Sequence, residues 1–156
     1  MFDLEEKKFH YKRARFATHL PRERFYTAGH YWLAVDQDDA DVYYVGYTKF
    51  ATRMLGDIVE FDFEKEPSSA VKLGEIIGWI EGFKASSDIY AIVDGTFISG
   101  NPALEDDPDL MRKEPYGSGW LYKVKGTIDP AKLSREEYGI VLDATIDKIL
   151  EGEEHE

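Results

Sequence analysis

The stretch Ile80-Glu81-Gly82-Phe83-Lys84-Ala85-Ser86-Ser87-Asp88-Ile89-Tyr90 places one lysine between two runs that favour β-structure. Residues 75–80 and 88–93 are rich in isoleucine and aromatic residues, so each run predicts a strand. The residues between them then form the turn of a β-hairpin with Lys84 at its tip. A hairpin tip exposes its side chain and holds it by backbone on both sides. Such a position suits an enzyme that must reach a single amine; the simpler alternative is a solvated lysine on a turn.

The rest of the chain favours short strands separated by turns. Further segments rich in β-branched and aromatic residues lie at 31–35, 42–47, 57–63, 96–99 and 120–125. Gly95 is predicted to turn the chain, and residues 101–119 form a long connection that contains prolines. Many short strands without alternating helices predict a mainly β fold, built as an antiparallel sandwich or a flattened barrel.

Two helices are expected. Thr48 can cap a short helix that runs through Leu55, and Gly56 suits the C′ position after it. Near the C-terminus, Ser134 and Glu137 have the spacing of a capping box. A core-facing apolar stripe follows at helical spacing, formed by Tyr138, Val141, Leu142, Thr145, Ile146, Ile149 and Leu150. Residues 151–156 are expected to form a frayed acidic tail.

The chain divides into a leader, a β-domain and a C-terminal segment. Residues 1–25 are predicted to be a basic, irregular leader. Residues 26–126 hold the predicted strands, and residues 127–156 supply the helix and acidic tail packed on the same domain. The leader can pack across the acidic body or act as a docking arm, and the sequence leaves both alternatives open.

Composition argues against several classes of function. The chain of 156 residues has a net charge of −12 and no cysteine, which excludes disulfides and thiolate metal sites. The negative charge disfavours nucleic acid and anionic membranes and favours partners with basic faces. No apolar run reaches the length of a membrane span, and the start of the chain lacks the apolar segment of a secretory signal. We therefore expect a cytoplasmic protein, or a mitochondrial one if the source is a eukaryote. A monomer is expected, although the sequence has no feature that fixes the oligomeric state.

The sequence also lacks the motifs of a catalytic centre. Serine nucleophile elbows, phosphate loops and histidine pairs with metal-ligand spacing are missing. His10, His19 and His155 are expected at the surface, and His30 is expected to pack at a strand start. The aspartates of 36–41 lack the alternation and the glycine of a calcium loop, so a polar turn is preferred. The sequence predicts no catalytic residue, no metal site and no enzymatic activity.

Several segments, in this order, resemble the glycine cleavage system H protein family. They are Val45-Gly46-Tyr47-Thr48-Lys49-Phe50-Ala51, Leu55-Gly56-Asp57-Ile58-Val59, the hairpin stretch, Asn101-Pro102-Ala103-Leu104 and Pro115-Tyr116-Gly117-Ser118-Gly119-Trp120-Leu121-Tyr122-Lys123. The resemblance covers about residues 26–125 and extends more loosely into the C-terminal helix. It implies a barrel-sandwich hybrid with a protruding hairpin, and it makes residues 26–126 a lipoyl-carrier domain.

The resemblance implies that Lys84 carries lipoic acid, attached as N6-lipoyl-lysine. The carrier would move the aminomethyl group left by glycine decarboxylation. The implied partners are a PLP-dependent glycine decarboxylase, an aminomethyltransferase, dihydrolipoamide dehydrogenase and a lipoyl-attaching enzyme. Glu81 matches a family glutamate that a modifying enzyme can read as an acidic flank. Asp88 matches a family aspartate, whose carboxylate could hold a protonated aminomethyl amine.

Some positions depart from the family pattern. Gly82 and Phe83 replace the usual Ser-Val pair, and Phe83 could shelter the arm or contact a different partner. Tyr31 stands where the family usually has an acidic residue. These departures leave open an H-like lipoyl carrier for sulfur oxidation or lipoate relay, and an unmodified interaction module. A biotin carrier is rejected, because that family flanks its lysine with methionines whereas Phe83 and Ala85 flank Lys84.

Overall fold

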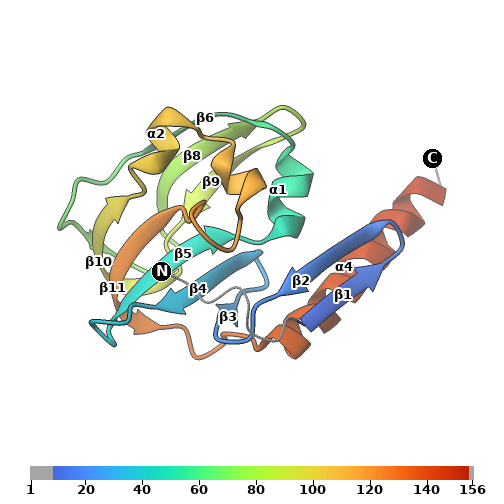
Figure 1. The fold of residues 1–156 in the computed structure, drawn as a ribbon, viewed down its shortest axis with the longest axis horizontal. Helices are drawn as coiled ribbons and strands as arrows, with labels where there is room; N and C mark the ends of the chain where they lie inside the picture. Colours follow the sequence, from blue (N-terminus) through green and yellow to red (C-terminus); the bar gives the residue numbers. More distant parts are fainter. Residues whose placement is uncertain (1–8, 155–156) are drawn as a thin grey trace.

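Residues 9–154, which the computed structural model describes, form three antiparallel sheets with a long helix beside them (Figure 1). One sheet has the strand order β3-β4-β5-β11-β10-β7, a second has β6-β8-β9, and β1 pairs with β2 alone. The strands are β1 (Phe9–Arg13), β2 (Phe16–Leu20), β3 (Phe25–Tyr26), β4 (Tyr31–Val35), β5 (Val42–Tyr47), β6 (Ile58–Phe63), β7 (Ala70–Val71), β8 (Ile76–Gly82), β9 (Ser86–Tyr90), β10 (Val93–Gly100) and β11 (Tyr122–Ile128). The helices are α1 (Lys49–Leu55), α2 (Ala103–Asp106), α3 (Leu110–Lys113) and α4 (Arg135–Glu154).

The main core lies between the six-stranded and the three-stranded sheet. Leu33, Val45 and Val124 enter it from the larger sheet, and Ile80 and Ile89 enter it from the smaller one. Burying an aliphatic side chain of this size stabilises the folded chain by roughly 1.5–3 kcal/mol relative to leaving it exposed. Two antiparallel sheets over one core confirm the predicted mainly β barrel-sandwich fold with a short helix and a C-terminal helix.

The segment predicted as an irregular leader contains a β-hairpin. β1 and β2 pair along their whole length, and the hairpin lies beside α4 (Figure 1). Tyr11, Phe16 and Leu20 are buried in a second hydrophobic cluster that also contains residues of α1 and α4. Because alternate side chains of a strand point to the same side, these apolar residues form one buried face although charged residues separate them. The prediction of an irregular leader over residues 1–25 is therefore wrong over the β1–β2 hairpin, whereas residues 21–24 are irregular. Residues 1–8 lie outside the described part.

Charged contacts attach this hairpin to α4. The guanidinium of Arg13 lies 2.8 Å from Asp147 and 3.4 Å from Asp143, and the Tyr11 hydroxyl donates to Asp143 at 2.8 Å. Ion pairs as exposed as these contribute little stability by themselves, so the buried aromatic contacts must supply most of it. The sequence left open whether the basic leader packs on the acidic body or acts as a docking arm. In the structure β1 packs against acidic residues of α4, as the first alternative describes.

Helix α4 begins as the sequence predicts and ends later. The Glu137 amide donates to Ser134 Oγ at 3.1 Å, and the Ser134 amide donates to Glu137 Oε1 at 3.0 Å, which confirms the capping box. The predicted stripe is buried in its first half, at Tyr138, Leu142 and Ile146. Its end is more exposed, at Ile149 and Leu150. The helix continues through Glu154, so the predicted tail from residue 151 is corrected over its first residues.

The strand boundaries after the lysine hairpin also differ from the prediction. β9 ends at Tyr90, and the next strand, β10, starts at Val93. Gly95 does not turn the chain but lies inside β10, opposite Gly126 of β11. A Cβ atom at Gly95 would lie 1.9 Å from the Lys125 carbonyl oxygen, so the glycine permits close approach of two backbones. The connection over 101–119 contains α2 and α3, which the sequence did not predict.

The half-buried His30 gives the fold a defined pH dependence. Its Nδ1 lies 2.8 Å from the Tyr138 hydroxyl, and its ring centroid lies 4.7 Å from that of Phe50, which confirms the packing role predicted for it. Burial lowers the pKa of His30 to about 4 from its ordinary value of 6.5. Between these two values the unfolded chain takes up a proton that the folded chain does not. The stabilisation from neutral His30 is therefore complete above pH 6.5 and is lost as the pH falls towards 4.

We expect the free energy of unfolding to fall by up to about 3 kcal/mol between pH 6.5 and pH 4 because of His30 alone. Denaturant titrations at several pH values measure this change. His30→Asn is the control, because asparagine tolerates the positive φ of 71° at this position and does not titrate. A variant whose stability falls with the same slope as that of the parent chain would show that His30 is not the responsible group.

Candidate functional site

Lys84 lies at the tip of the β8–β9 hairpin. The two strands pair in the register Trp79↔Asp88, Ile80↔Ser87 and Glu81↔Ser86. The Gly82 amide donates to the Ala85 carbonyl at 2.8 Å and closes the turn. The Lys84 side chain is exposed. The hairpin and the position of Lys84 at its tip are as predicted from the sequence.

Main-chain hydrogen bonds fix the tip against the connection between α1 and β6. The Lys84 amide donates to the Leu55 carbonyl, and the Phe83 amide donates to the Asp57 carbonyl, both at 2.8 Å. This approach requires glycine at position 82, because a Cβ atom there would lie 2.1 Å from the Leu55 carbonyl oxygen. The lysine is therefore exposed at its side chain and ordered at its backbone.

The stem of Lys84 borders a groove of about 410 Å³. A Cβ atom added at Gly56, whose φ is +77°, would lie 2.9 Å from Lys84 Cγ, so the stem passes close to this glycine. The other residues lining the groove are Lys49, Thr52, Arg53, Asp57, Phe83 and Arg112. Asp57 pairs with Arg112 at 3.2 Å, which leaves the groove with an excess of positive charge.

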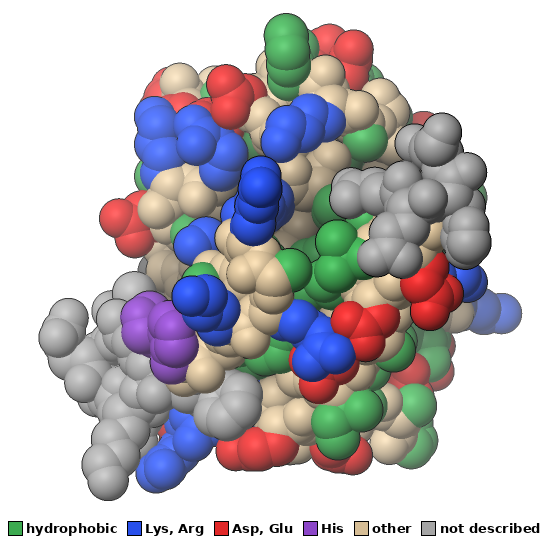
Figure 2. Space-filling view, turned by 90° about the vertical axis from the view of Figure 1, so that its right-hand side faces the viewer, with side chains coloured by type: hydrophobic (Ala, Val, Ile, Leu, Met, Phe, Trp, Pro, Cys, Tyr) green, Lys and Arg blue, Asp and Glu red, His purple; other side chains and the backbone are tan. Residues whose placement is uncertain are grey.

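The groove is part of a cationic face. Figure 2 shows the right-hand side of the molecule in Figure 1, where α1 and the tip of the β1–β2 hairpin lie, and Lys and Arg side chains run down its middle. The sequence did not reveal this surface, because α1, α3 and the tip of the β8–β9 hairpin contribute its cations from separate parts of the chain. The net charge of −12 indicated the opposite sign.

The structure separates the four site residues that the sequence predicted. Phe83 lies beside Lys84 at the groove and is 84% exposed. Glu81 and Asp88 line a different cavity, of about 400 Å³, which shares no lining residue with the groove. Strand pairing places Glu81 next to Glu60 and places Asp88 next to Trp79, so both carboxylates lie on the outer face of the three-stranded sheet.

Two buried tyrosines hold the base of the hairpin. The chain leaves β9 at Tyr90, and the Tyr90 amide donates to the Tyr31 hydroxyl at 3.0 Å. The Tyr122 hydroxyl donates to the Tyr90 carbonyl at 3.0 Å and accepts from the Ile92 amide at 3.2 Å. Burial raises the pKa of Tyr31 and of Tyr122, so both hydroxyls stay neutral. Tyr31, one of the departures from the family pattern, thus accepts a hydrogen bond from the backbone at the base of the hairpin.

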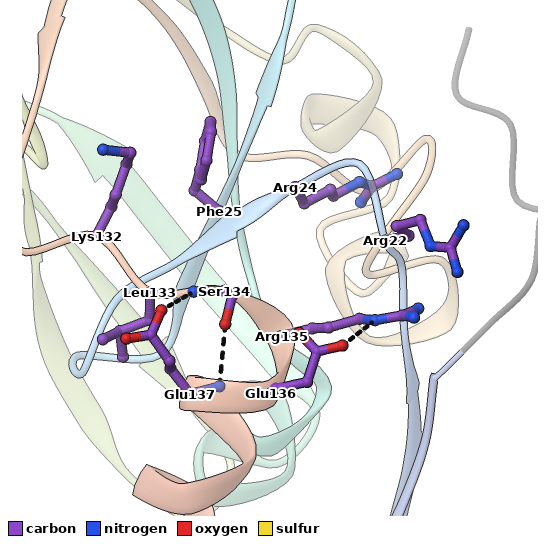
Figure 3. Close-up of a pocket in the computed structure, with 9 residues that line it drawn as sticks. All are labelled: Arg22, Arg24, Phe25, Lys132, Leu133, Ser134, Arg135, Glu136 and Glu137. Atoms are coloured by element: carbon purple, nitrogen blue, oxygen red, sulfur yellow. Dashed lines mark hydrogen bonds and ion pairs between the residues drawn. The ribbon is translucent and has the colours of Figure 1, made fainter.

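A second basic cavity, of about 490 Å³, lies at the start of α4 (Figure 3). Its carboxylates interact within the chain, since Glu137 closes the capping box and Glu136 lies 3.0 Å from Arg135. The buried Arg24 lies 4.3 Å above the Trp32 ring. The remaining residues that line it are Arg22, Phe25, Lys132, Leu133 and Ser134. It shares no lining residue with the Lys84 groove and is a separate feature.

Residues 9–154 contain neither a metal-binding cluster nor a helix that could span a membrane. No group of three or more His, Asp or Glu side chains in this part is placed to hold a metal ion. None of its helices is long and apolar enough to cross a membrane.

Comparison with known proteins gives one consistent result. The family model of the glycine cleavage H-protein matches residues 24–149. A glycine cleavage system H protein of Thermobifida fusca is 42% identical over 118 residues, which cover 76% of this chain and 90% of that protein. One of Bacteroides fragilis is 42% identical over 106 residues, covering 68% and 81%. The crystal structure of a glycine cleavage system H protein from Mycobacterium marinum has a TM-score of 0.68 and 36% identity, covering 76% of this chain and 95% of that one.

Proposed function

Because the chain belongs to the glycine cleavage H-protein family, a family of carrier proteins rather than enzymes, we propose that Lys84 carries a covalently attached lipoyl group. With this group the chain would shuttle the aminomethyl group of glycine decarboxylation between the glycine cleavage enzymes. The observation that carries the proposal is the exposed Lys84 side chain on a backbone fixed to Leu55 and Asp57. A carrier needs such a fixed base, because tethering makes each later encounter nearly intramolecular.

The residues around Lys84 fit a lipoyl arm. An amide at Nζ removes the positive charge of the lysine, which sits among other cations at the groove. When bound, the lipoyl group supplies a disulfide that can be reduced and that can hold a cargo, and partner enzymes supply the catalysis. Phe83 and the stem of Lys84 line the same groove, so Phe83 would give the base of the arm an apolar neighbour.

A carrier of this type passes through attachment, loading, unloading and reoxidation, and each step requires one of the proposed partner enzymes. A lipoyl-attaching enzyme acylates Lys84, and Glu81 provides an acidic flank that this enzyme can read. A PLP-dependent glycine decarboxylase loads the carrier, an aminomethyltransferase unloads it, and dihydrolipoamide dehydrogenase reoxidises it. Each enzyme has access to the hairpin tip, because Phe83 and Lys84 are both exposed.

Asp88 is proposed to hold the protonated amine of the cargo through its carboxylate. We expect Asp88→Ala to leave lipoylation of Lys84 unchanged, because the two residues line different cavities. Loss of the cargo should become about two- to fivefold faster, which is the range expected for an exposed charged contact. The decay of radiolabelled cargo on the purified protein measures this rate. Equal lifetimes in the variant and the parent chain would remove Asp88 from the mechanism.

Reconstituted exchange between glycine and labelled bicarbonate tests the proposed pathway. The lipoylated chain is mixed with glycine decarboxylase, and incorporation of label into glycine is followed. We expect exchange that depends on the lipoylated chain and is absent with unmodified chain. A chain that is lipoylated but supports no exchange would instead favour an H-like carrier for another pathway, an alternative motivated by Phe83 and Tyr31.

A further inference from the structure

The β1–β2 hairpin borders the Lys84 groove although it lies outside the part of the chain that matches the family. Lys49 lines the groove, and its Nζ donates to the Ala17 carbonyl of β2 at 3.0 Å. Arg53 also lines the groove, and its guanidinium carbon lies 5.7 Å from the centroid of the Phe16 ring. Strand β2 therefore lies against the two basic residues of α1 that line the groove.

The hairpin is held firmly enough to present charges at a fixed place. Phe16 packs edge-on against Phe50 of α1, with ring centroids 5.5 Å apart. On the other side Arg13 contacts Asp147 of α4 through two hydrogen bonds, at 2.8 and 2.9 Å. Arg15, which lies in the turn of the hairpin next to Phe16, is exposed.

These contacts place the β1–β2 hairpin next to the basic residues of the groove. Lys49, Arg53 and Lys84 are exposed cations that line the groove, and Arg15 is an exposed cation in the turn next to Phe16, whose ring Arg53 contacts. Figure 2 shows Lys and Arg side chains gathered on this side of the molecule. The chain as a whole has a net charge of −12, so this face has the opposite sign to the rest of the molecule. A localised patch of this kind attracts an oppositely charged partner and orients it before contact.

We propose that α1 and the β1–β2 hairpin form a cationic docking face for an acidic surface of the lipoyl-attaching enzyme. This inference rests on the proposed function, since it takes Lys84 as the acceptor. The attaching enzyme must bring its reaction centre to Nζ and therefore covers the surface around the base of the arm. Enzymes that react with the dithiolane ring meet the far end of the arm instead.

The attachment reaction forms one bond to Lys84 and breaks one bond in the activated lipoyl donor. The neutral amine of Lys84 attacks the carbonyl carbon of lipoyl adenylate, which the attaching enzyme makes from lipoate and ATP. The C–N amide bond forms, and the bond between the carbonyl carbon and the phosphate oxygen breaks. AMP leaves with the electron pair of that bond, and the amine loses a proton to the solvent. The docking face takes no part in this chemistry and affects only the encounter.

Kinetics of lipoylation test the proposal. The probe is purified lipoate–protein ligase from the same organism, supplied with ATP and lipoate, and the acceptor is the full chain. We expect Arg15→Glu/Arg53→Glu to raise the KM for the acceptor on the order of tenfold, with kcat nearly unchanged. Added salt should raise the KM of the parent chain more than that of the variant.

The matched control is Lys72→Glu/Lys125→Glu, which has the same net charge. Both of its lysines are exposed, and Lys72 lies near the start of β8 whereas Lys84 follows its end. A KM for Arg15→Glu/Arg53→Glu equal to that of this control, in chains with matching thermal midpoints, would overturn the docking face. The single variant Arg15→Glu tests the contribution of the β1–β2 hairpin alone. A KM equal to that of the single variant Lys72→Glu would show that the hairpin takes no part in docking. Failure of the parent chain to accept lipoate while another acceptor is modified would overturn the proposed function as well.

Discussion

Lys84→Arg is expected to abolish lipoylation and all carrier function while leaving the fold intact. Arginine keeps the positive charge at the hairpin tip, but its guanidinium stays protonated and cannot act as the acyl acceptor. The side chain at position 84 is exposed, so the free energy of unfolding should change by no more than about 0.5 kcal/mol. Intact mass after incubation with lipoate–protein ligase, ATP and lipoate gives the extent of modification, and a thermal melt checks the fold.

Lys49→Arg is the matched control for this experiment. Lys49 lines the same groove and also carries an exposed amine, so it is the nearest competing acceptor among the residues of the groove. We expect the Lys49→Arg chain to be lipoylated as fully as the parent chain. Lipoyl mass on the Lys84→Arg chain would show that another amine is the acceptor, and the proposed site would then be wrong.

Gly82→Ala is expected to displace the hairpin tip and to slow lipoylation strongly. The new Cβ atom would lie 2.1 Å from the Leu55 carbonyl oxygen and 2.7 Å from the carbonyl carbon, so the turn must move away from α1. The same movement lengthens the hydrogen bond from the Lys84 amide to the Leu55 carbonyl, which is 2.8 Å long. Misplacing a reacting group by about 1 Å can cost on the order of 100-fold in rate, and we expect a loss of that order.

Gly82→Ala should destabilise the chain without unfolding it. Overpacking of this kind costs roughly 1–3 kcal/mol, which a chain with two hydrophobic clusters can tolerate. Gly29→Ala is the control, because a Cβ atom there meets its nearest neighbour at 3.8 Å and its φ is not positive. A normal rate of lipoylation in a destabilised Gly82→Ala chain would mean that the seating of the tip on α1 does not position the acceptor.

Some features that depend on neighbouring residues in the sequence were predicted correctly. The lysine hairpin follows from two apolar runs around a short polar turn, and α1 follows from Thr48 and Gly56 at its ends. The separation of Glu81 and Asp88 from the groove could also have been derived from the period of two in a strand. That period puts both carboxylates on the solvent face of the sheet.

Features that depend on distant contacts were missed. β1 and β2 are stable because Tyr11 and Phe16 pack on α1 and α4, which follow them far along the chain. A glycine such as Gly95 is typical of a turn when only the sequence is considered. Its actual role, to permit the close approach of β11, depends on a strand far along the chain. The groove is formed by α1, α3 and the tip of the β8–β9 hairpin together, so no single segment of the sequence indicates it.

The intact mass of the chain purified from its native source, followed by mapping of the modified peptide, shows whether Lys84 carries a lipoyl group in the cell. We expect one lipoyl group per chain, located on Lys84 and absent from every other lysine. An unmodified Lys84, in cells whose other lipoyl acceptors are fully modified, would contradict this expectation.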